Sequence, residues 1–392
     1  MGRIPPRGVL KQALGPHAFE SDTKRRMDTA QRLTLAGTAV LAVAWLAWPS
    51  PERPETASVP VAAPTVWETW DAEPVDWPGQ IDGRAWTPLH VLEDTDDADD
   101  PALLATDEAG SLLYIEQDDD GEAAVTVVAE PGGVPGVVAA AATRDRLAWI
   151  TSVPDERGRV VSQLWAAERD AGGRPGEATL LTADTGDVIT SGSAYDLQFA
   201  AEGLHWLATV RSETLVTEHR SISVDGGDVS VVGHRGAWQA AAWPWLASAG
   251  SDSLGGAQLV RSDTGAGVKV FSGADELTLC SATWCRLVVT ADDGSRVDLV
   301  RPDGTDRVTV SKGFTSAVSP DVGLIDRFEP LAASTSATGE GTTVTLFDLQ
   351  AGTAYLVASS AGEAGADDRC LWWSTGTGEL LVWHVLDLTD LA

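Results

Sequence analysis

The sequence predicts an all-β fold, a β-propeller of seven four-stranded blades, preceded by one transmembrane helix. Two observations carry this prediction. Beyond residue 64 the chain contains short apolar runs, roughly four to eight residues long, separated by Gly, Asp and Pro, which is the pattern of strands and turns. Before residue 64 stands one uncharged apolar run, 33–48, which is the pattern of a membrane-spanning helix. Hydrophobic residues make up 43% of the chain, enough to build a core.

The apolar run 33–48 separates two segments of opposite charge. As a helix it would span about 24 Å, slightly less than the ~30 Å hydrocarbon core of a bilayer. Trp45 and Trp48 stand at its C-terminal end, where indole rings favour the membrane interface. The preceding residues 1–32 carry a net charge of +4, and the residues after the run carry −35. The positive-inside rule therefore predicts a cytoplasmic tail (1–32), a single-pass anchor in the cell membrane (33–48) and an extracellular domain.

Other interpretations of this segment stay open. Arg25 and Arg26 resemble the arginine pair of an export signal, in which case the apolar run would belong to a cleaved signal peptide. A buried helix of a globular domain is disfavoured because residues 49–64 contain five prolines. That composition predicts an extended linker (49–64) between the anchor and the propeller domain (65–392).

One arrangement recurs along the propeller domain: an apolar strand, a turn containing Gly and often Asp, and a second apolar strand. The turn glycines of six copies follow one another at intervals of 39 to 54 residues. Two further apolar runs precede a copy, which makes four strands per unit, the spacing of propeller blades. The six copies are 112–128, 161–181, 221–232, 258–271, 297–310 and 344–357.

A seventh unit begins at Cys370 and stops at Ala392 without a fourth strand. An open blade edge would promote aggregation, and the large apolar residues between 64 and 83, such as Trp70 and Trp77, would be costly to leave exposed. We therefore expect a strand from residues 64–83 to pair beside residues 380–388 and close the ring. Six blades are the alternative, if the first and last units merge.

In architecture these repeats resemble the extracytoplasmic propellers of the TolB-like and WD-repeat-like type found in G+C-rich bacteria. Segments 279–286 (LCSATWCR) and 371–388 (LWWSTGTGELLVWHVLDL) look similar to features of membrane-anchored propellers of this sort. The composition fits a G+C-rich genome, because the chain has no Asn and four Lys. The resemblance implies an extracellular propeller and brings with it no catalytic residue.

Cys280 and Cys285 end neighbouring predicted strands, with a turn between them, so their side chains can face each other across a hairpin. Outside the cell such a pair is oxidised, which predicts a disulfide. Free thiols and a metal site stay open as alternatives, although zinc needs four ligands and no nearby His or Cys completes the set. Cys370 begins an apolar strand, and we expect it to be a buried small hydrophobic residue.

No local motif assigns a catalytic, metal-binding or cofactor-binding residue. The acidic runs 94–100 and 118–120 could bind calcium, but they lack the spacing of an EF-hand loop, so we expect solvated loops and no cofactor. The six histidines are scattered, and we expect His205 and His384 to be hydrogen-bonded structural residues. The nucleophile motif Gly-x-Ser-x-Gly of the serine hydrolases is absent from the sequence.

These observations favour a non-catalytic module that binds a protein or cell-envelope ligand outside the cell. The net charge of −31 argues against nucleic-acid binding, which needs clustered positive charge. One alternative is a propeller hydrolase of the lactonase or glycosidase type, because its metal ligands come from different blades and leave no local motif. Another is a transmembrane signalling protein whose tail, 1–32, contacts a cytoplasmic regulator.

Overall fold

The described strands all lie in one compact unit, Pro54–Ala392. The expected tail, the expected anchor and most of the expected linker lie outside the described residues. Within the part that is described, no helix is both long and apolar enough to cross a membrane. The computed structural model describes residues 63–92, 102–117, 121–131, 136–200, 203–210, 214–249, 255–274, 276–291, 294–313, 315–334 and 341–392.

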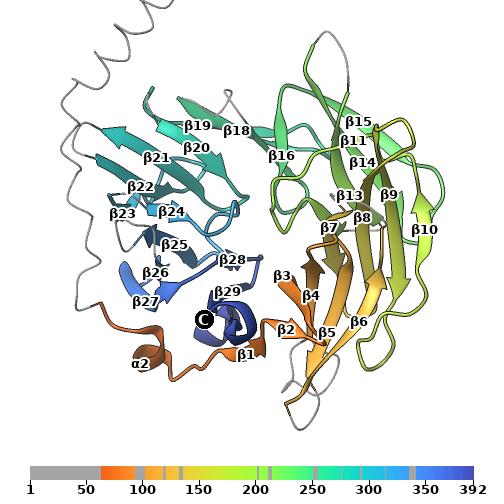
Figure 1. Cartoon of the computed structure of the whole chain (residues 1–392). Helices are drawn as coiled ribbons and strands as arrows, with labels where there is room; N and C mark the ends of the chain where they lie inside the picture. The colour runs from red at the N-terminus through yellow and green to blue at the C-terminus, as the bar shows by residue number, and fades with distance from the viewer. Residues whose placement is uncertain are drawn as a thin grey trace, which may run out of the picture. The chain divides into compact units, whose positions relative to one another are not determined.

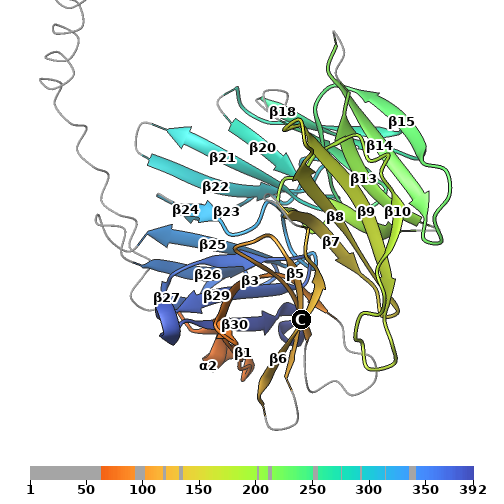
Figure 2. The same ribbon diagram turned by 45° about the vertical axis from the view of Figure 1, so that its right-hand side comes forward.

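Seven antiparallel sheets form a ring of blades, as Figures 1 and 2 show, and the prediction of a seven-bladed propeller is confirmed. We name the axis of this ring, toward which the innermost strands lie, the central channel. Blade 1 contains β3 (Arg84–Leu92), β4 (Ala102–Asp107), β5 (Leu112–Gln117) and β6 (Ala123–Ala129), with β2 (Gln80–Ile81) added beside β3. Blade 2 contains β7 (Gly136–Ala142), β8 (Arg146–Pro154), β9 (Val160–Glu168) and β10 (Thr179–Thr182). Blade 3 contains β11 (Asp187–Val188), β12 (Leu197–Ala200), β13 (Gly203–Thr209), β14 (Val216–Ser223) and β15 (Ser230–Arg235).

The next three blades each have four strands in chain order. Blade 4 contains β16 (Trp238–Ala240), β17 (Trp245–Ser248), β18 (Gly256–Arg261) and β19 (Gly267–Phe271). Blade 5 contains β20 (Glu276–Cys280), β21 (Cys285–Ala291), β22 (Gly294–Val300) and β23 (Val308–Lys312). Blade 6 contains β24 (Thr315–Ala317), β25 (Phe328–Ser334), β26 (Thr342–Asp348) and β27 (Thr353–Ala361). In each blade the first strand lies toward the centre and the last lies at the rim (Figure 1).

Blade 7 joins the two ends of the domain, as the sequence led us to expect. It contains β28 (Ala364–Ala366), β29 (Cys370–Thr375), β30 (Val382–Asp387) and, as its rim strand, β1 (Val75–Pro78). β1 is antiparallel to β30, with Trp77 opposite Trp383, and both indoles are almost fully buried. The N-terminal strand therefore covers the edge that the last three strands would leave open.

Between the linker and β1 the chain forms a short helix, α2 (Val66–Trp70), which the sequence analysis did not anticipate. Thr65 and Glu68 form a reciprocal capping box at its start, which satisfies two backbone donors of a helix too short to be stable alone. Val66 is fully buried, and the Trp70 ring packs edge-on against Tyr355 of β27 with centroids 4.5 Å apart. The helix thus attaches the start of the domain to blades 6 and 7.

The core of the propeller is a ring of seven apolar clusters in the described residues, each lying between two neighbouring blades. The adjacent residues Trp372 and Trp373 illustrate this arrangement, because alternation along β29 sends their side chains to opposite faces of blade 7. Trp372 packs toward blade 1 and Trp373 toward blade 6, and both are buried. Cys370 is buried as expected, in the cluster between blades 7 and 1.

Replacing Trp77 by Ala removes the largest side chain of the closing strand from a fully buried position. We expect a loss of about 3–5 kcal/mol in the free energy of unfolding, measured with chemical denaturant, together with concentration-dependent aggregation from the exposed edge. The matched control is Leu380→Ala in the same blade, because Leu380 is 81% exposed, and it should change stability by less than about 0.5 kcal/mol. Equal effects of the two substitutions would contradict closure by β1.

Candidate functional site

Chemically active side chains gather at one mouth of the central channel. His90 lies near the end of β3, the innermost strand of blade 1, and Asp367 and Asp368 directly follow β28, the innermost strand of blade 7. The Nδ1 atom of His90 lies 3.0 Å from Oδ2 of Asp367. One nitrogen or oxygen atom from each of these three residues lies within 4.8 Å of the others. Residues 277 positions apart are therefore neighbours, because the ring brings blade 7 beside blade 1.

The Asp367 carboxylate is held in place by the backbone around it. Its Oδ1 atom accepts hydrogen bonds from the amides of Arg369 (2.9 Å) and Cys370 (2.6 Å), and its Oδ2 atom accepts one from the amide of Val91 (3.0 Å). The His90 ring is its fourth close neighbour, through the 3.0 Å contact between Nδ1 and Oδ2. Asp367 is therefore a rigid acceptor that fixes the orientation of the His90 ring.

The electrostatics of this cluster follow from burial and from these contacts. Burial disfavours a charged His90 ring, but the hydrogen bond to Asp367 and the negative charges of Asp367 and Asp368 together outweigh it, and the net effect is a raised pKa for His90. For Asp367, burial opposes ionisation, yet the hydrogen bonds from His90 and the backbone lower its pKa. Burial and the nearby charge of Asp367 raise the pKa of Asp368. The two neighbouring carboxylates thus differ in proton affinity, since Asp367 has donors and Asp368 mainly has a like charge beside it.

A loop of blade 3, residues 189–196, interrupts the innermost strand of that blade between β11 and β12, and we name it the channel plug. Both flanking strands pair with β13, so β11 and β12 are two halves of one innermost strand and the plug is an insertion between them. Its tip reaches blade 6: Ser193 Oγ lies 2.5 Å from Oδ1 of Asp321, and the amide of Ala194 donates to Oδ2 at 2.9 Å. A small cavity of about 10 Å³ lies between the plug and the inner residues of blades 4, 5 and 6.

The plug is stiffened from within by Asp196. This buried carboxylate accepts hydrogen bonds from the amides of Ser191, Gly192 and Ser193, at 2.7 to 3.2 Å, and from the Ser191 hydroxyl. Burial raises the pKa of Asp321 to about 6, although the hydrogen bonds from the plug favour its charged form. The contact between blades 3 and 6 is therefore made by a partly desolvated acid.

A buried ion pair holds the loop that carries Asp321. Arg286 of β21 and Glu329 of β25 are 2% and 0% exposed, with Nε and Oε1 2.5 Å apart. Arg286 also donates to the carbonyl of Asp321 at 2.7 Å, and Glu329 accepts from the amide of Gly323 at 3.0 Å. Both charges are thus paired and hydrogen-bonded, which is the condition under which burying them is tolerable.

The predicted disulfide stands beside this loop. The structure joins Cys280 and Cys285, whose Cα atoms are 4.0 Å apart at the end of the β20–β21 hairpin. Within that hairpin the Ser281 hydroxyl donates to the carbonyl of Val322, 2.8 Å away. The cross-link therefore also fixes a turn that supports the Asp321 loop.

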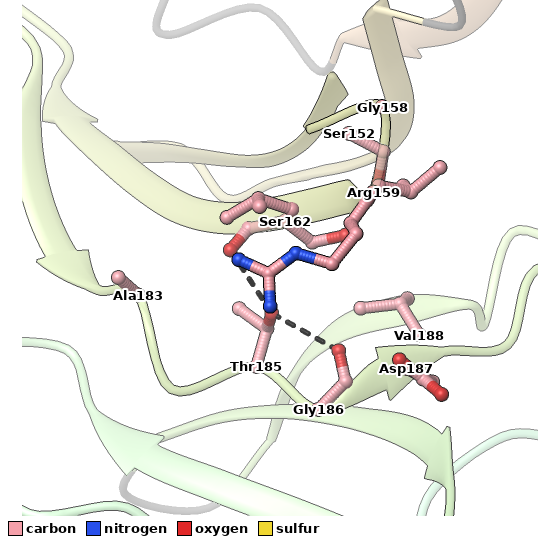
Figure 3. Close-up of a pocket in the computed structure, with 11 residues that line it drawn as sticks. Ser152, Gly158, Arg159, Ser162, Ala183, Thr185, Gly186, Asp187 and Val188 are labelled. Atoms are coloured by element: carbon pink, nitrogen blue, oxygen red, sulfur yellow. Dashed lines mark hydrogen bonds between the residues drawn. The ribbon is translucent and has the colours of Figure 1, made fainter. Parts of the chain in front are cut away.

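A second feature is an open groove of about 840 Å³ between blades 2 and 3 (Figure 3). It lies between the β8–β9 turn and the segment that leads into β11, so it is at the opposite ends of the innermost strands from His90 and Asp367. Figure 3 shows Arg159, Ser162 and Thr185 among its lining residues, with the Thr185 hydroxyl bonded to the carbonyl of Ser162 at 3.1 Å. Val160 at its rim is 62% exposed.

Three other histidines, His205, His219 and His384, have structural partners. His205 Nδ1 lies 3.0 Å from His219 Nε2, His205 Nε2 lies 3.1 Å from the carbonyl of Ala200, and Trp243 stacks on the His205 ring. Burial lowers the pKa of both histidines, that of His219 to about 4. His384 contacts Asp76 and Thr375. The expectation of hydrogen-bonded structural residues is confirmed for His205 and His384.

The acidic runs 94–100 and 118–120 both lie outside the described residues. The carboxylates that the structure does bring together at the channel, Asp321, Asp367 and Asp368, were not singled out in the sequence. Asp321 is a single aspartate in its loop, and Asp367 and Asp368 are only a pair, so neither loop shows a repeated acidic pattern with ligand spacing. The signal that could have pointed to them is their position after an innermost strand, which becomes visible only once the blades are counted.

No family model and no curated protein matches the sequence. Among solved structures, a mutant puromycin hydrolase has a TM-score of 0.46 and 13% identity, over 70% of this chain and 45% of its own length. The β-propeller domain of the trilobed protease from Pyrococcus furiosus has a TM-score of 0.47 and 11% identity, over 78% and 97%. TolB from Acinetobacter baumannii has a TM-score of 0.32 and 13% identity, over 57% and 63%. The chain thus spans less than half of the puromycin hydrolase, and these likenesses carry no information about activity.

Replacing Arg286 by Met leaves Glu329 charged and unpaired in the interior. We expect this variant to lose about 3–5 kcal/mol in the free energy of unfolding. The double variant Arg286→Met, Glu329→Leu leaves no charge behind, so it should be more stable than Arg286→Met alone. Denaturant unfolding of both single variants and of the double variant measures this difference. If the loss of stability in the double variant equals the sum of the losses in the two single variants, the two charges do not stabilise each other, and the account of the buried pair is wrong.

Proposed function

We propose that this chain is a membrane-tethered, extracytoplasmic propeller that binds a protein or cell-envelope ligand without changing it chemically. The tether is the apolar run 33–48, whose flanking charges favour a cytoplasmic tail and an external domain. The observation that carries the proposal is the groove between blades 2 and 3, with a volume of about 840 Å³. A groove of this size on a rigid ring is suited to holding a ligand segment.

The lining of the groove fits recognition. Its floor is hydrogen-bonded internally: the hydroxyls of Ser152 and Ser162 lie 2.6 Å apart, and Thr185 donates to Ser162. At the rim, Arg159 is 69% exposed and is held by Asp155, with Nη2 and Oδ2 2.7 Å apart. The rim thus combines an exposed apolar residue, Val160, with a positioned cation, which is the mixture that protein-binding surfaces use.

The charge of the domain favours certain partners. Residues after the anchor carry a net charge of −35, so long-range attraction increases the encounter rate with cationic proteins and slows the approach of anionic ones. The exposed Arg159 then provides a local contact for a carboxylate of the bound segment. A partner with a basic surface and an acidic or polar docking segment satisfies both conditions.

The proposal is tested by co-purification of partners with the full-length chain from membranes, followed by quantitative mass spectrometry. Val160→Asp places a charge at the groove rim, and Val268→Asp places the same charge on the rim strand of blade 4, where Val268 is 38% exposed. We expect Val160→Asp to reduce recovery of the bound partner at least tenfold and Val268→Asp to leave it unchanged.

Two results would contradict the proposal. Equal recovery of the partner with both variants would show that the groove is not the binding surface. A ligand recovered in hydrolysed form with the unmodified chain, but intact without it, would favour the hydrolase alternative.

A further inference from the structure

We propose that His90, Asp367 and Asp368 bind a divalent transition-metal ion at the mouth of the central channel. The site is separate from the blade 2–blade 3 groove and does not depend on the proposed function. Its ligands come from the first and last blades, whose neighbourhood exists because the ring is closed.

The geometry meets the first requirement for a metal site, convergence of ligand atoms. One atom each of His90, Asp367 and Asp368 lies within 4.8 Å of the other two. Two ligands of one ion, each about 2.0–2.2 Å from it, are up to ~4.4 Å apart, so small rotations of the side chains suffice.

The surroundings of the aspartates meet the second requirement, ligands that are held in place. The Asp367 carboxylate accepts hydrogen bonds from three backbone amides, and its Oδ2 atom lies 3.0 Å from Nδ1 of His90. Hydrogen bonds to a ligating carboxylate are a recurrent feature of metal sites. Asp368 completes the set, because one of its oxygen atoms lies within 4.8 Å of a ligand atom of His90 and of Asp367.

The donor set selects the class of ion. Calcium prefers six to eight oxygen ligands, whereas one imidazole nitrogen with carboxylate oxygens suits zinc, manganese and related first-row ions. Three protein ligands leave coordination positions for water, unlike the closed four-ligand sites of structural zinc. The site is also distinct from the acidic runs 94–100 and 118–120, for which the sequence analysis considered calcium but expected solvated loops.

A metal ion at this position would connect blade 1 with blade 7. Since it binds the closed ring and not the unfolded chain, it should raise the melting temperature, and the rise should grow with the logarithm of the free metal concentration above the dissociation constant. This readout is independent of any catalytic or binding activity of the protein.

The test is calorimetric titration of the purified full-length chain with Zn²⁺, with Ca²⁺ as a second probe, together with thermal melts. We expect one Zn²⁺ site per chain above the background of surface carboxylates, and weaker binding of Ca²⁺. Asp368→Asn and His90→Gln should each weaken this site at least tenfold and abolish the Zn²⁺-dependent rise in melting temperature.

His384→Gln is the matched control. His384 also contacts an aspartate, Asp76, but has no second carboxylate in a ligand cluster. This variant should bind Zn²⁺ like the unmodified chain. Circular dichroism checks that each variant is folded. If His90→Gln is not folded, the Zn²⁺ titration and thermal melt of Asp368→Asn alone test the proposal.

Three outcomes would overturn the proposal. The first is the absence of a saturable Zn²⁺ site. The second is a site that persists in Asp368→Asn, which would place the ion on other surface carboxylates. The third is Ca²⁺ binding that is tighter than Zn²⁺ binding and is weakened by Asp368→Asn, which would show that the site binds calcium and not a transition metal.

Discussion

The antiparallel pairing of β1 with β30 is the interaction on which the rest of this structure depends. The apolar core is not one mass but a ring of clusters between neighbouring blades, and each blade is stabilised by the two beside it. Without β1, blade 7 would have an open edge and would lose Trp77 from the cluster that it shares with blade 1. Closure therefore converts a linear array of blades into a ring in which no blade is terminal.

The channel mouth is a consequence of this closure. His90 and Asp367 belong to opposite ends of the domain, and their contact at 3.0 Å exists because blade 7 returns to blade 1. A second contact across the ring is made by the plug, which joins blade 3 to Asp321 of blade 6, whose loop is held by the buried pair of Arg286 and Glu329. Both contacts connect blades far apart along the chain, and both rely on the ring having a fixed diameter.

The sequence predicted the blades because each hairpin carries its own signal, a glycine turn such as Asp303-Gly304 between two apolar strands. It predicted the closing strand because blade 7 lacked one and Trp77 needed burial. It could not predict the plug, since residues 189–196 interrupt a strand and resemble an ordinary polar loop. Nor could it predict the pairing of His90 with Asp367, which depends on where innermost strands end in three dimensions and leaves no local spacing.

Native-state hydrogen exchange of the backbone amides tests the central claim, closure by β1, most directly. If closure stabilises the whole ring, the amides of β1 that pair with β30 open only when the domain unfolds, and their exchange free energies equal those of β29. Free energies for β1 that are several kcal/mol lower than for β29, with the other blades still protected, would show that β1 detaches locally and that the ring holds together without it.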